Sequence, residues 1–411
     1  MASMNEAVVV DAVRSPIGKS GWKGMEKNGQ LCQASAQDLM ASVLRELIER
    51  VKAKSDKFDP VEIEEVIIGC LSQVGEQGLN IARVVSLLAG IPKEASGCTV
   101  NQYCNAGLKA INIAAQAIML GNGDTIVCGG VELMSHYSMG SDLKVALDAK
   151  YPVRLSPGMG STGMTVPQGV CAEMIADQYN LSRDDMDRFG MWSHQKATKA
   201  LRDGRFDDHV VPFEFEHAGE KKLVDKDETI RPAALDDPES FLQSMRKLKP
   251  AFKPDGAVTA GNSSQIVDGA AAVILMSADK AERLGLDPLC KITGMAVSGG
   301  EPVPMLLAPI PASKKAMDRA GKTIDDMDVI EPNEAFASPC LAFCKELGYD
   351  FDDPRQNPTG GAIALGHPIG ASGVVYFGEM AHHLKRNDGK AGLQMMCGGG
   401  GVGIATVVEA V

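Results

Sequence analysis

The sequence predicts an α/β protein with a mostly parallel sheet covered by helices. Strand-like apolar segments at 7–13, 62–70 and 125–130 alternate with helix-like segments at 36–53 and 80–90. The connections between them are short, and this alternation is typical of parallel strands joined by helices. The same plan recurs in the C-terminal part, so we expect two similar halves.

The composition fits a globular protein of two or three domains. The chain has 411 residues, of which 45% are apolar, and a formal net charge of −12. This charge argues against a general nucleic-acid or membrane-surface binder, although a local basic patch can still hold a small anion. No apolar run approaches the ~18 residues of a membrane span.

The termini and the cysteines indicate a cytoplasmic protein. The start, "MASMNEAVVVDAVRSPIGK", lacks the basic residues and long apolar core of a secretory signal, and "VVEAV" at the end is no peroxisomal address. The ten cysteines show no paired spacing. We therefore expect reduced thiols, with neither a disulfide framework nor a metal site.

In the first half, "VNQYCNAGLKAINIAAQ" at 100–116 places Cys104 just before a helix that starts at Ala106. Asn101 and Asn105 are candidate caps of this helix. A helix N-terminus favours thiolate over thiol, which suits a nucleophile. A small, buried and inert cysteine is the competing interpretation.

Residues 134–266 differ in amino-acid composition from the two halves, because they are rich in Met, Pro, Gly and Ser. An amphipathic helix pair is expected at 171–204, with Ser182 and Asp185 as a capping box. We interpret 134–266 as an insertion that covers a site, and an ordinary surface elaboration is the alternative.

The second half repeats the strand–loop–helix plan. A strand enters a loop at 327–337, a helix fits 370–390, and a strand at 391–401 ends in cysteine and glycines. The order of features in 104–130 resembles that in 370–399, which is weak evidence for two related halves.

Four polar loops follow these strands and carry Cys104, Asn333, His367 and Cys397. Strand ends gather at one edge of such sheets, so the four side chains are expected to meet there. A thiol, an imidazole, a second thiol and an amide suit nucleophilic and acid–base chemistry, although each alone also has a structural explanation. The run "GGGGVG" continues as a strand and opens no helix, which excludes a dinucleotide-binding loop.

Five ordered motifs resemble those of the thiolases. They are "VRSPIGK" (13–19), "VNQYCNAGLKA" (100–110), "NEAFA" (333–337), "GGAIALGHPIGASG" (360–373) and "CGGGGVG" (397–403). The resemblance covers about residue 7 to 411.

The resemblance implies a five-layered α-β-α-β-α arrangement of two similar core domains with an inserted loop domain. We expect 1–133 with 267–287 to form the N-terminal core domain and 134–266 to form the inserted loop domain that binds coenzyme A (CoA). The C-terminal core domain is then 288–411.

By the same resemblance, the chain is an acyltransferase of lipid metabolism that exchanges acyl groups between CoA thioesters. It cleaves 3-ketoacyl-CoA to acetyl-CoA and a shortened acyl-CoA, or runs the reverse condensation. Cys104 is then the acylated nucleophile, His367 accepts its proton, and Cys397 handles the α-carbon proton. Asn333 holds the water of one oxyanion hole, and the N–H groups of Cys104 and Gly399 form the other.

The resemblance also implies the residues that bind the substrate. They are Arg231, Ser244, Phe252, Ala260, Ser264, Ala335 and Phe336. The basic stretch Arg246, Lys247, Lys249 and Lys253 either meets the CoA phosphates or forms a solvated face. CoA is a substrate, so no cofactor is expected, and thiolases suggest a homodimer or homotetramer.

One departure bears on the subtype. Many thiolases carry a His-Met-Gly segment where this chain has "VPQGVCAEM", with Pro167 at the histidine position. This favours a degradative thiolase over the acetoacetyl-CoA-forming type, which stays as the alternative. A ketoacyl synthase is disfavoured by Cys397 and "NEAFA", and a thiolase-like lipid carrier by the intact set of reactive residues.

Overall fold

The structure, a computed structural model, describes residues 4–21, 29–148 and 156–411. Seven residues of the predicted insertion 134–266, namely 149–155, lie outside the described residues. Residues 1–3 and 22–28 of the predicted N-terminal domain also lie outside them. Among the described residues, no helix has both the length and the apolar character needed to cross a bilayer.

The N-terminal half alternates strands and helices as the sequence predicts. Its elements are β1 (Ala7–Arg14), β2 (Gly18–Lys19), α1 (Ala36–Lys54), β3 (Glu65–Gly69), α2 (Ile81–Leu88), β4 (Ser96–Val100), α3 (Ala106–Met119), β5 (Thr125–Leu133) and, after the insertion, β8 (Val267–Ser277). Helix α1 begins at the N-cap Ser35, whose hydroxyl accepts from the N–H groups of Gln37 and Asp38.

The segment between β5 and β8 is mostly helical. It contains α4 (Ser141–Asp148), α5 (Gln168–Gln178), α6 (Arg183–Arg202), the hairpin of β6 (Phe213–His217) and β7 (Glu220–Val224), α7 (Ala233–Asp236) and α8 (Pro238–Arg246). The predicted capping box is confirmed, because Ser182 and Asp185 bond each other's backbone N–H at the start of α6.

The C-terminal half follows with α9 (Ala278–Leu284), β9 (Cys290–Gly299), α10 (Pro309–Ala320), β10 (Val329–Pro332), α11 (Ala337–Leu347), α12 (Ser372–Arg386), β11 (Ala391–Gly398) and β12 (Val402–Glu409). The chain after "GGGG" is a strand, as expected from the sequence. The exact limits of the three predicted domains stay a prediction.

The strands of the two halves join into one sheet in the order β10-β11-β12-β9-β1-β8-β5-β3-β4, with β2 added beside β8. The halves meet where β1 pairs with β9 over only two residue pairs, Val8 with Lys291 and Val9 with Cys290. The sheet is mixed, so the expectation of a mostly parallel sheet is wrong. Among the described strands, parallel pairing is limited to β3–β4, β3–β5 and β10–β11.

Chain connectivity explains the antiparallel pairs. Strands β11 and β12 are joined by a short glycine turn and must therefore run antiparallel. Strand β8 enters from the insertion and lies antiparallel between β1 and β5. The alternation of strand-like and helix-like segments along the sequence identified the parallel units. It missed the antiparallel strands β8 and β12.

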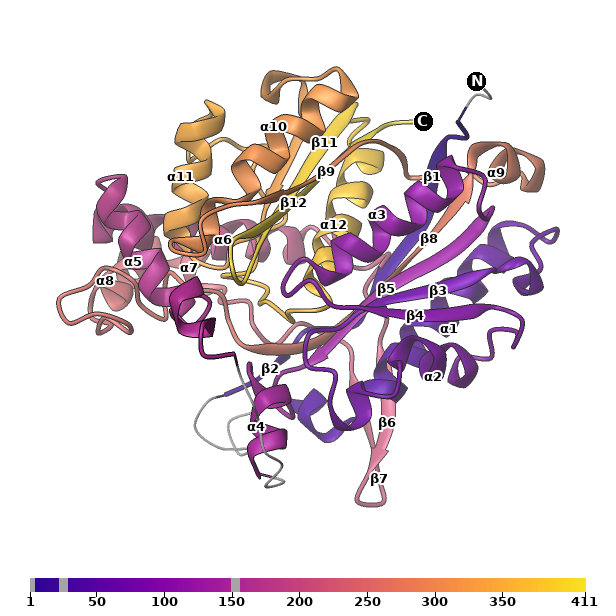
Figure 1. Cartoon of the computed structure of the whole chain (residues 1–411), viewed down its shortest axis with the longest axis horizontal. Coiled ribbons are helices and arrows are strands. Elements are labelled where there is room, and N and C mark those ends of the chain that lie inside the picture. Colours follow the sequence, from indigo (N-terminus) through magenta and orange to yellow (C-terminus); the bar gives the residue numbers. More distant parts are fainter. Residues whose placement is uncertain (1–3, 22–28, 149–155) are drawn as a thin grey trace.

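The predicted five layers are confirmed, and Figure 1 shows their arrangement. Helices α3 and α12 form a central layer whose buried side chains contact both halves of the sheet. Helices α1 and α2 cover the outer face of the N-terminal half, and α10 and α11 cover that of the C-terminal half. The central layer carries the starts of α3 and α12, which follow the Cys104 and His367 loops.

A buried ion-pair network attaches the insertion to this core. The Arg14 guanidinium donates two bonds to Asp227, at 2.8 and 2.9 Å, and one to Glu379 of α12 at 2.8 Å. Burial alone raises the pKa of Glu379, but the His209 and Arg14 charges lower it to about 2. The arginine of "VRSPIGK" therefore joins three distant parts of the chain.

Candidate active site

Three of the four predicted reactive residues lie at the carboxyl ends of strands, whereas the expectation of a strand before His367 is wrong, because its loop follows helix α11. Cys104 follows β4, Asn333 follows β10, and Cys397 is the second-last residue of β11. His367 lies on the loop that leads into α12. Because α12 and α3 pack together in the central layer, the loops of the two halves meet at one edge of the sheet.

Backbone conformation presents the Cys104 thiol. Tyr103, directly before it, has a left-handed backbone with φ of 53°, which is uncommon for an aromatic residue. The Asn101 side chain stabilises this turn by accepting from the Tyr103 N–H at 2.9 Å and donating to the Leu71 carbonyl at 3.2 Å. Cys104 is consequently buried against Met134 and Ile369.

The Cys104 thiol is neutral, contrary to the thiolate that the helix N-terminus suggested. Burial, followed by the nearby Cys397 thiol, raises the pKa of Cys104 to about 12. The Gln168 side chain, at the start of α5, lowers the pKa but does not offset burial. The nucleophile therefore needs a base to remove its proton.

The predicted caps of α3 are wrong. Asn105 occupies the N-cap position but its side chain makes no capping bond, and Asn101 bonds Tyr103 instead of the helix. The Asn105 side-chain amide faces the carbonyl groups of Met396 and Cys397 on β11 and, with its nitrogen towards them, can donate to both. Tertiary partners thus replace the local bond that sequence position suggested.

His367, the predicted base, has a ring nitrogen that is free to accept this proton. Its Nδ1 lies 2.6 Å from the Ser372 hydroxyl, which itself donates to the Pro368 carbonyl at 3.0 Å. Since the hydroxyl has one proton, Nδ1 must donate to it and Nε2 is left as the basic nitrogen. Nε2 is buried without a partner, and burial lowers the pKa of His367 to about 4, so the ring is neutral.

Cys397 and Asn333 complete the group. Burial raises the pKa of Cys397 to about 12, while the adjacent Asn333 side chain lowers it. Neither amide atom of Asn333 has a hydrogen bond of normal geometry, although the residue is buried. Buried amides are rarely left unpaired, so this one is free to hold a ligand or water.

Gly399 also reaches the nucleophile loop, because a Cβ there would lie 3.4 Å from the Tyr103 ring. The N–H groups of residues 104 and 399 therefore belong to adjoining loops. The structure thus places Cys104 near Cys397 and Cys397 near Asn333, and Cys104 packs with Ile369, two residues after His367.

The predicted substrate-binding residues fall into two groups. Near the thiols, the Ser264 N–H donates to the Ala335 carbonyl at 3.0 Å, and the Phe252 ring meets the edge of Phe336 at 5.9 Å. Ala260 is exposed on the same 257–264 segment.

The second group lies at α7 and α8. Arg231 is close enough to His194 to lower its pKa, although burial is the larger cause. The His194 ring packs on Phe241, whose carbonyl accepts from the Ser244 hydroxyl at 2.6 Å. Arg231 and Ser244 are therefore linked to each other through the contact between His194 and Phe241.

The predicted basic patch is partly neutralised. Arg246 pairs with Asp184, and Lys253 pairs with Asp177 at 2.9 Å. Lys247 and Lys249 are exposed. Half of the patch is therefore occupied by ion pairs, which favours a solvated face at Arg246 and Lys253.

Sequence reasoning missed Glu132 on β5. Its buried carboxylate accepts from the N–H groups of Leu71 (2.9 Å), Ser72 (3.1 Å) and Gly370 (3.1 Å) and from the Gln77 amide (2.9 Å). Glu132 therefore connects the loop of Leu71 and Ser72, whose Leu71 carbonyl binds the Asn101 amide, to the loop that contains His367. A carboxylate in an otherwise apolar strand was the only available signal.

One cluster has metal-ligand residue types. Single ligand atoms of Asp208, His209 and His382 lie within 4.8 Å of one another. The two imidazoles, however, stack with ring centroids 4.6 Å apart at 13°, so their in-plane lone pairs do not converge on one ion. Asp208 also pairs with Arg386 and His209 with Glu379, which makes the cluster a salt-bridge network.

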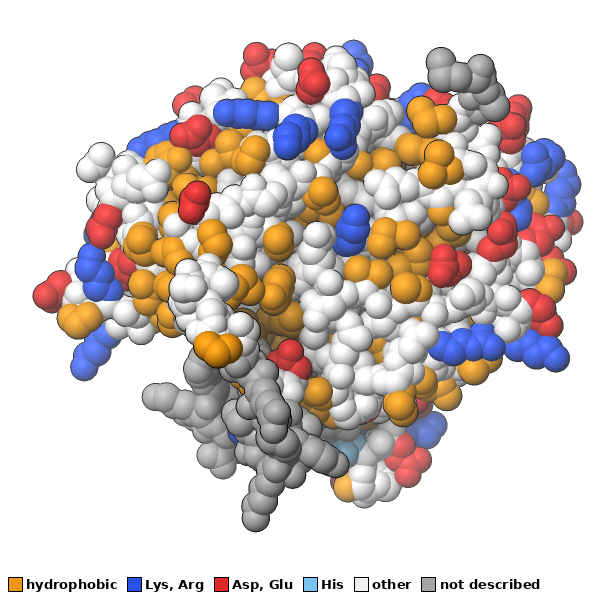
Figure 2. Space-filling model, viewed as in Figure 1, with side chains coloured by type: hydrophobic (Ala, Val, Ile, Leu, Met, Phe, Trp, Pro, Cys, Tyr) orange, Lys and Arg blue, Asp and Glu red, His pale blue; other side chains and the backbone are white. Residues whose placement is uncertain are grey.

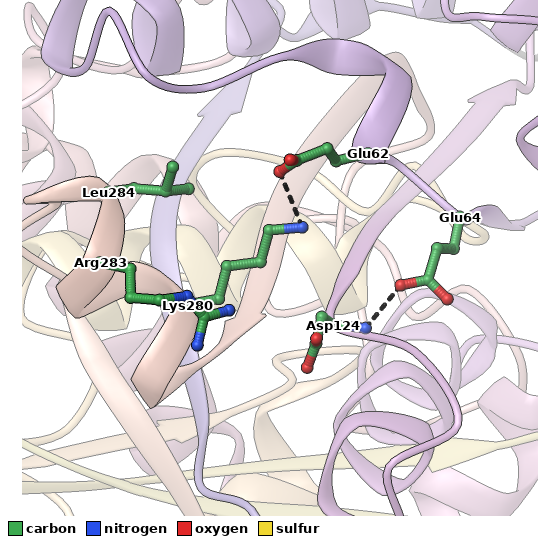
Figure 3. A pocket seen from close by; sticks show the side chains of 6 residues that line it. All are labelled: Glu62, Glu64, Asp124, Lys280, Arg283 and Leu284. Atoms are coloured by element: carbon green, nitrogen blue, oxygen red, sulfur yellow. Dashed lines mark hydrogen bonds and ion pairs between the residues drawn. The ribbon is translucent and has the colours of Figure 1, made fainter.

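A cavity of about 390 Å³ lies away from the thiols (Figure 3). Its lining residues are Glu62, Glu64, Asp124, Lys280, Arg283 and Leu284. The three acidic residues precede β3 and β5, at the opposite end of these strands from Cys104, and the other three lie on α9. Lys280 pairs with Glu62 at 3.0 Å, and the lining contains no thiol or imidazole to act as a nucleophile or base.

The chain is similar to thiolases over almost its whole length. The thiolase N-terminal domain model matches residues 7–279, and the thiolase C-terminal domain model matches 286–410. A 3-ketoacyl-CoA thiolase of Marinomonas sp. (strain MWYL1) is 44% identical, with 99% of each chain covered. One of Alcanivorax borkumensis is 43% identical, over 99% of this chain and 98% of the relative.

A solved structure is similar over its whole length. The crystal structure of the Bacillus anthracis acetyl-CoA acetyltransferase has a TM-score of 0.86 and 33% identity, with 100% of both chains covered.

The hydrogen bond from His367 to Ser372 gives a direct test of the base. We expect Ser372→Ala to slow alkylation of Cys104 by iodoacetamide at pH 7.5 about tenfold, a barrier increase of about 1.4 kcal/mol, because Nδ1 loses its acceptor. Peptide mass spectrometry measures the rate. Ser338→Ala, which removes an equally buried hydroxyl bonded to Ala172, serves as the control and should alkylate at the wild-type rate. Equal rates for both variants would show that the Ser372 bond is dispensable.

Proposed function

The chain belongs to the thiolase family, and from this premise we propose that it cleaves 3-ketoacyl-CoA with a second CoA through an acyl-enzyme on Cys104. The observation that carries the proposal is the set of unpartnered polar atoms beside two buried thiols. They are His367 Nε2 and both amide atoms of Asn333. Such atoms are costly in a closed interior and are explained by a substrate that completes their bonds.

The proposed reaction begins with transfer of the Cys104 proton to His367 Nε2. The sulfur attacks the 3-keto carbon, and breakage of the bond between carbons 2 and 3 leaves the acyl group on Cys104. Cys397 gives its proton to carbon 2, which releases acetyl-CoA. A new CoA then gives its thiol proton to Cys397 and attacks the acyl-enzyme. Cys104 finally recovers its proton from His367.

Oxyanions arise at two positions along this path, on the carbonyl oxygen of the transferred acyl group and on the thioester oxygen of the departing acetyl-CoA, and donors from different loops would stabilise them. The Cys104 and Gly399 N–H groups belong to adjoining loops and suit one oxyanion. The unpaired Asn333 amide suits a water that completes the other together with His367. Donors of this kind typically contribute about 3 kcal/mol each to transition-state stabilisation.

Two thiols suit a thioester exchange for a chemical reason. Cys104 and the thiol of CoA are leaving groups of matched quality, so the acyl group can pass in either direction. The second thiol, Cys397, reaches the weakly acidic α-carbon without a metal or cofactor, and we propose that none is used.

An apolar acyl chain is favoured over the acetyl-only alternative. The Cys397 side chain belongs to an apolar cluster with Met305, Leu306, Ala335 and Phe336, which offers a wall for a longer chain. The relatives at 42–44% identity are named 3-ketoacyl-CoA thiolase, which supports the same preference. We therefore propose a degradative role in fatty-acid β-oxidation, with acetoacetyl-CoA synthesis as the alternative.

We also propose that the chain works as a homo-oligomer in the cytoplasm. Strand β4 ends the sheet, pairs only with β3 among the described strands, and is followed by the Cys104 loop. Beside it, Leu79 and Leu87 are 87% and 49% exposed. Figure 2 shows several apolar patches on one face of the molecule, with single charged side chains among them. All ten cysteines are free, which supports a reducing compartment.

A chain-length series tests the substrate class. With CoA present, 3-ketohexanoyl-CoA should be cleaved with about tenfold higher kcat/KM than acetoacetyl-CoA, because two more buried methylenes contribute about 0.8 kcal/mol each. Loss of absorbance of the ketoacyl-CoA measures the rate, and Cys104→Ala gives the background. A preference for acetoacetyl-CoA would favour the biosynthetic alternative.

The role of Cys397 is tested by Cys397→Ser. A hydroxyl is a far weaker acid than a thiol with a pKa of ~8.5, so the variant lacks a usable base. We expect acetyl-CoA to acetylate Cys104 still, while thiolysis and deuterium exchange of the acetyl methyl protons fall more than a hundredfold. Intact-mass spectrometry and NMR measure the two steps on one preparation. Thiolysis within tenfold of wild type would assign the base to another residue.

The proposed oligomer is tested at the edge of β4. We expect Leu79→Glu/Leu87→Glu to convert the wild-type dimer or tetramer into smaller species in sedimentation velocity, because buried carboxylates oppose association. Leu223→Glu, at a residue 54% exposed on β7, is the matched control and should leave the assembly unchanged. A monomeric wild-type protein would refute the assembly outright.

A further inference from the structure

The residue after the nucleophile links the two halves of the molecule at the reacting thiols. Asn105 is completely buried and precedes α3. With its amide oriented so that the nitrogen faces β11, Asn105 can donate to the Met396 carbonyl at 3.2 Å and to the Cys397 carbonyl at 3.0 Å. We propose that Asn105 is a positioning residue that sets the separation of Cys104 from Cys397. This inference rests on the proposed function, which gives both thiols their roles.

The direction of these bonds follows from chemistry. The opposite amide orientation would place Oδ1 against two carbonyl oxygens, which repel it. Only the NH₂ group, with two hydrogens, can satisfy both carbonyls at once. The neighbouring Gly398 leaves room for the contact, because a Cβ there would lie only 3.1 Å from the Asn105 amide.

The backbone of Asn105 transmits this constraint to Cys104. Its N–H donates to the Gln102 carbonyl at 3.1 Å, and its carbonyl accepts from the Lys109 N–H at 2.8 Å in the first turn of α3. The residue is therefore fixed on both sides. Because Cys104 is bonded directly to it, a shift of the Asn105 side chain would move the thiol.

On the other strand, the bonds fix the end of β11. Holding the Cys397 carbonyl sets the orientation of the peptide that leads to Gly398, and the Gly399 N–H is the next donor along the chain. The same amide thus aligns the two N–H groups proposed for one oxyanion hole, those of Cys104 and Gly399. Reacting groups need placement to about 0.5 Å, which a two-point bond from a short, buried side chain can supply.

The chain offers a matched control on the same helix. Asn112, two turns along α3, is also buried, and its Oδ1 accepts from the Thr406 hydroxyl of β12 at 2.8 Å. It joins α3 to the C-terminal half as Asn105 does, but away from the thiols. Loss of either amide removes one buried link between the halves, and only loss of Asn105 should disturb the chemistry.

The experiment compares Asn105→Ala with Asn112→Ala in the full-length protein. We measure acetylation of Cys104 by acetyl-CoA, deuterium exchange of the acetyl methyl protons and thermal unfolding. Asn105→Ala should lose at least tenfold in acetylation of Cys104, in methyl exchange and in thiolysis, because the thiol and both oxyanion N–H groups depend on the same amide. Asn112→Ala should show a similar decrease in melting temperature, with exchange within twofold of wild type.

A second variant separates hydrogen bonding from space filling. Asn105→Asp keeps the shape, but its carboxylate cannot donate to the two carbonyls, whereas the protonated acid can donate to one. The ratio of variant to wild-type exchange rate should therefore rise at least fivefold as the pH is lowered from 8 to 5.5. A residue that merely fills space would give a constant ratio.

The outcomes decide between these roles. Exchange within twofold of wild type for both Asn105 variants would overturn the inference, as would an equal catalytic loss in Asn112→Ala. If Asn105→Ala does not fold, the pH dependence of Asn105→Asp decides alone. A wild-type protein that forms no acetyl adduct on Cys104 would contradict the proposed function itself, and with it this role.

Discussion

The close approach of α3 and α12 in the central layer is the constraint on which the active site depends. A Cβ at Gly107 would lie 2.9 Å from the Gly370 carbonyl oxygen, and one at Gly373 would lie 2.2 Å from the Leu108 nitrogen. The two helices therefore meet backbone to backbone, a contact that only glycine permits. Cys104 and His367 precede these contacts in their loops, so main-chain packing sets the distance between the proposed nucleophile and the proposed base.

The same burial keeps every reacting group neutral before substrate arrives. Burial raises the pKa of both Cys104 and Cys397 to about 12 and lowers that of His367 to about 4. Two thiolates side by side would repel each other, and a buried ion pair without further donors is costly. In the proposed mechanism, charge therefore develops only when a carbonyl oxygen enters the site and accepts bonds from the proposed oxyanion donors.

Buried hydrogen bonds and ion pairs, in addition to apolar packing, hold the loops around Cys104, His367 and Cys397. Glu132 gathers backbone N–H groups from the loop after β3 and from the His367 loop. Arg14 joins the insertion to α12 through Asp227 and Glu379. Asn105 joins the nucleophile to β11. Each tie has directional bonds to several partners, so it fixes a geometry that side-chain packing would leave loose.

The sequence alone determined the local units, the residue types and the family. Periodicity located α3 and α12, the Ser182 capping box was read correctly, and five ordered motifs identified Cys104, Asn333, His367 and Cys397 as a set. The helices and the capping box are confirmed because each depends on residues near one another in the chain, and the family is shown because the motifs are specific as a whole. The roles of the four residues stay a prediction.

Only the tertiary structure decided how the units pair and what state the reacting groups adopt. The sheet is mixed because β8 and β12 return antiparallel, which alternation along the sequence does not encode. Asn105 bonds β11 instead of capping α3, and burial outweighs the helix N-terminus at Cys104. In each case the deciding partner lies far away in sequence, and desolvation and long-range hydrogen bonds exist only once the chain has folded.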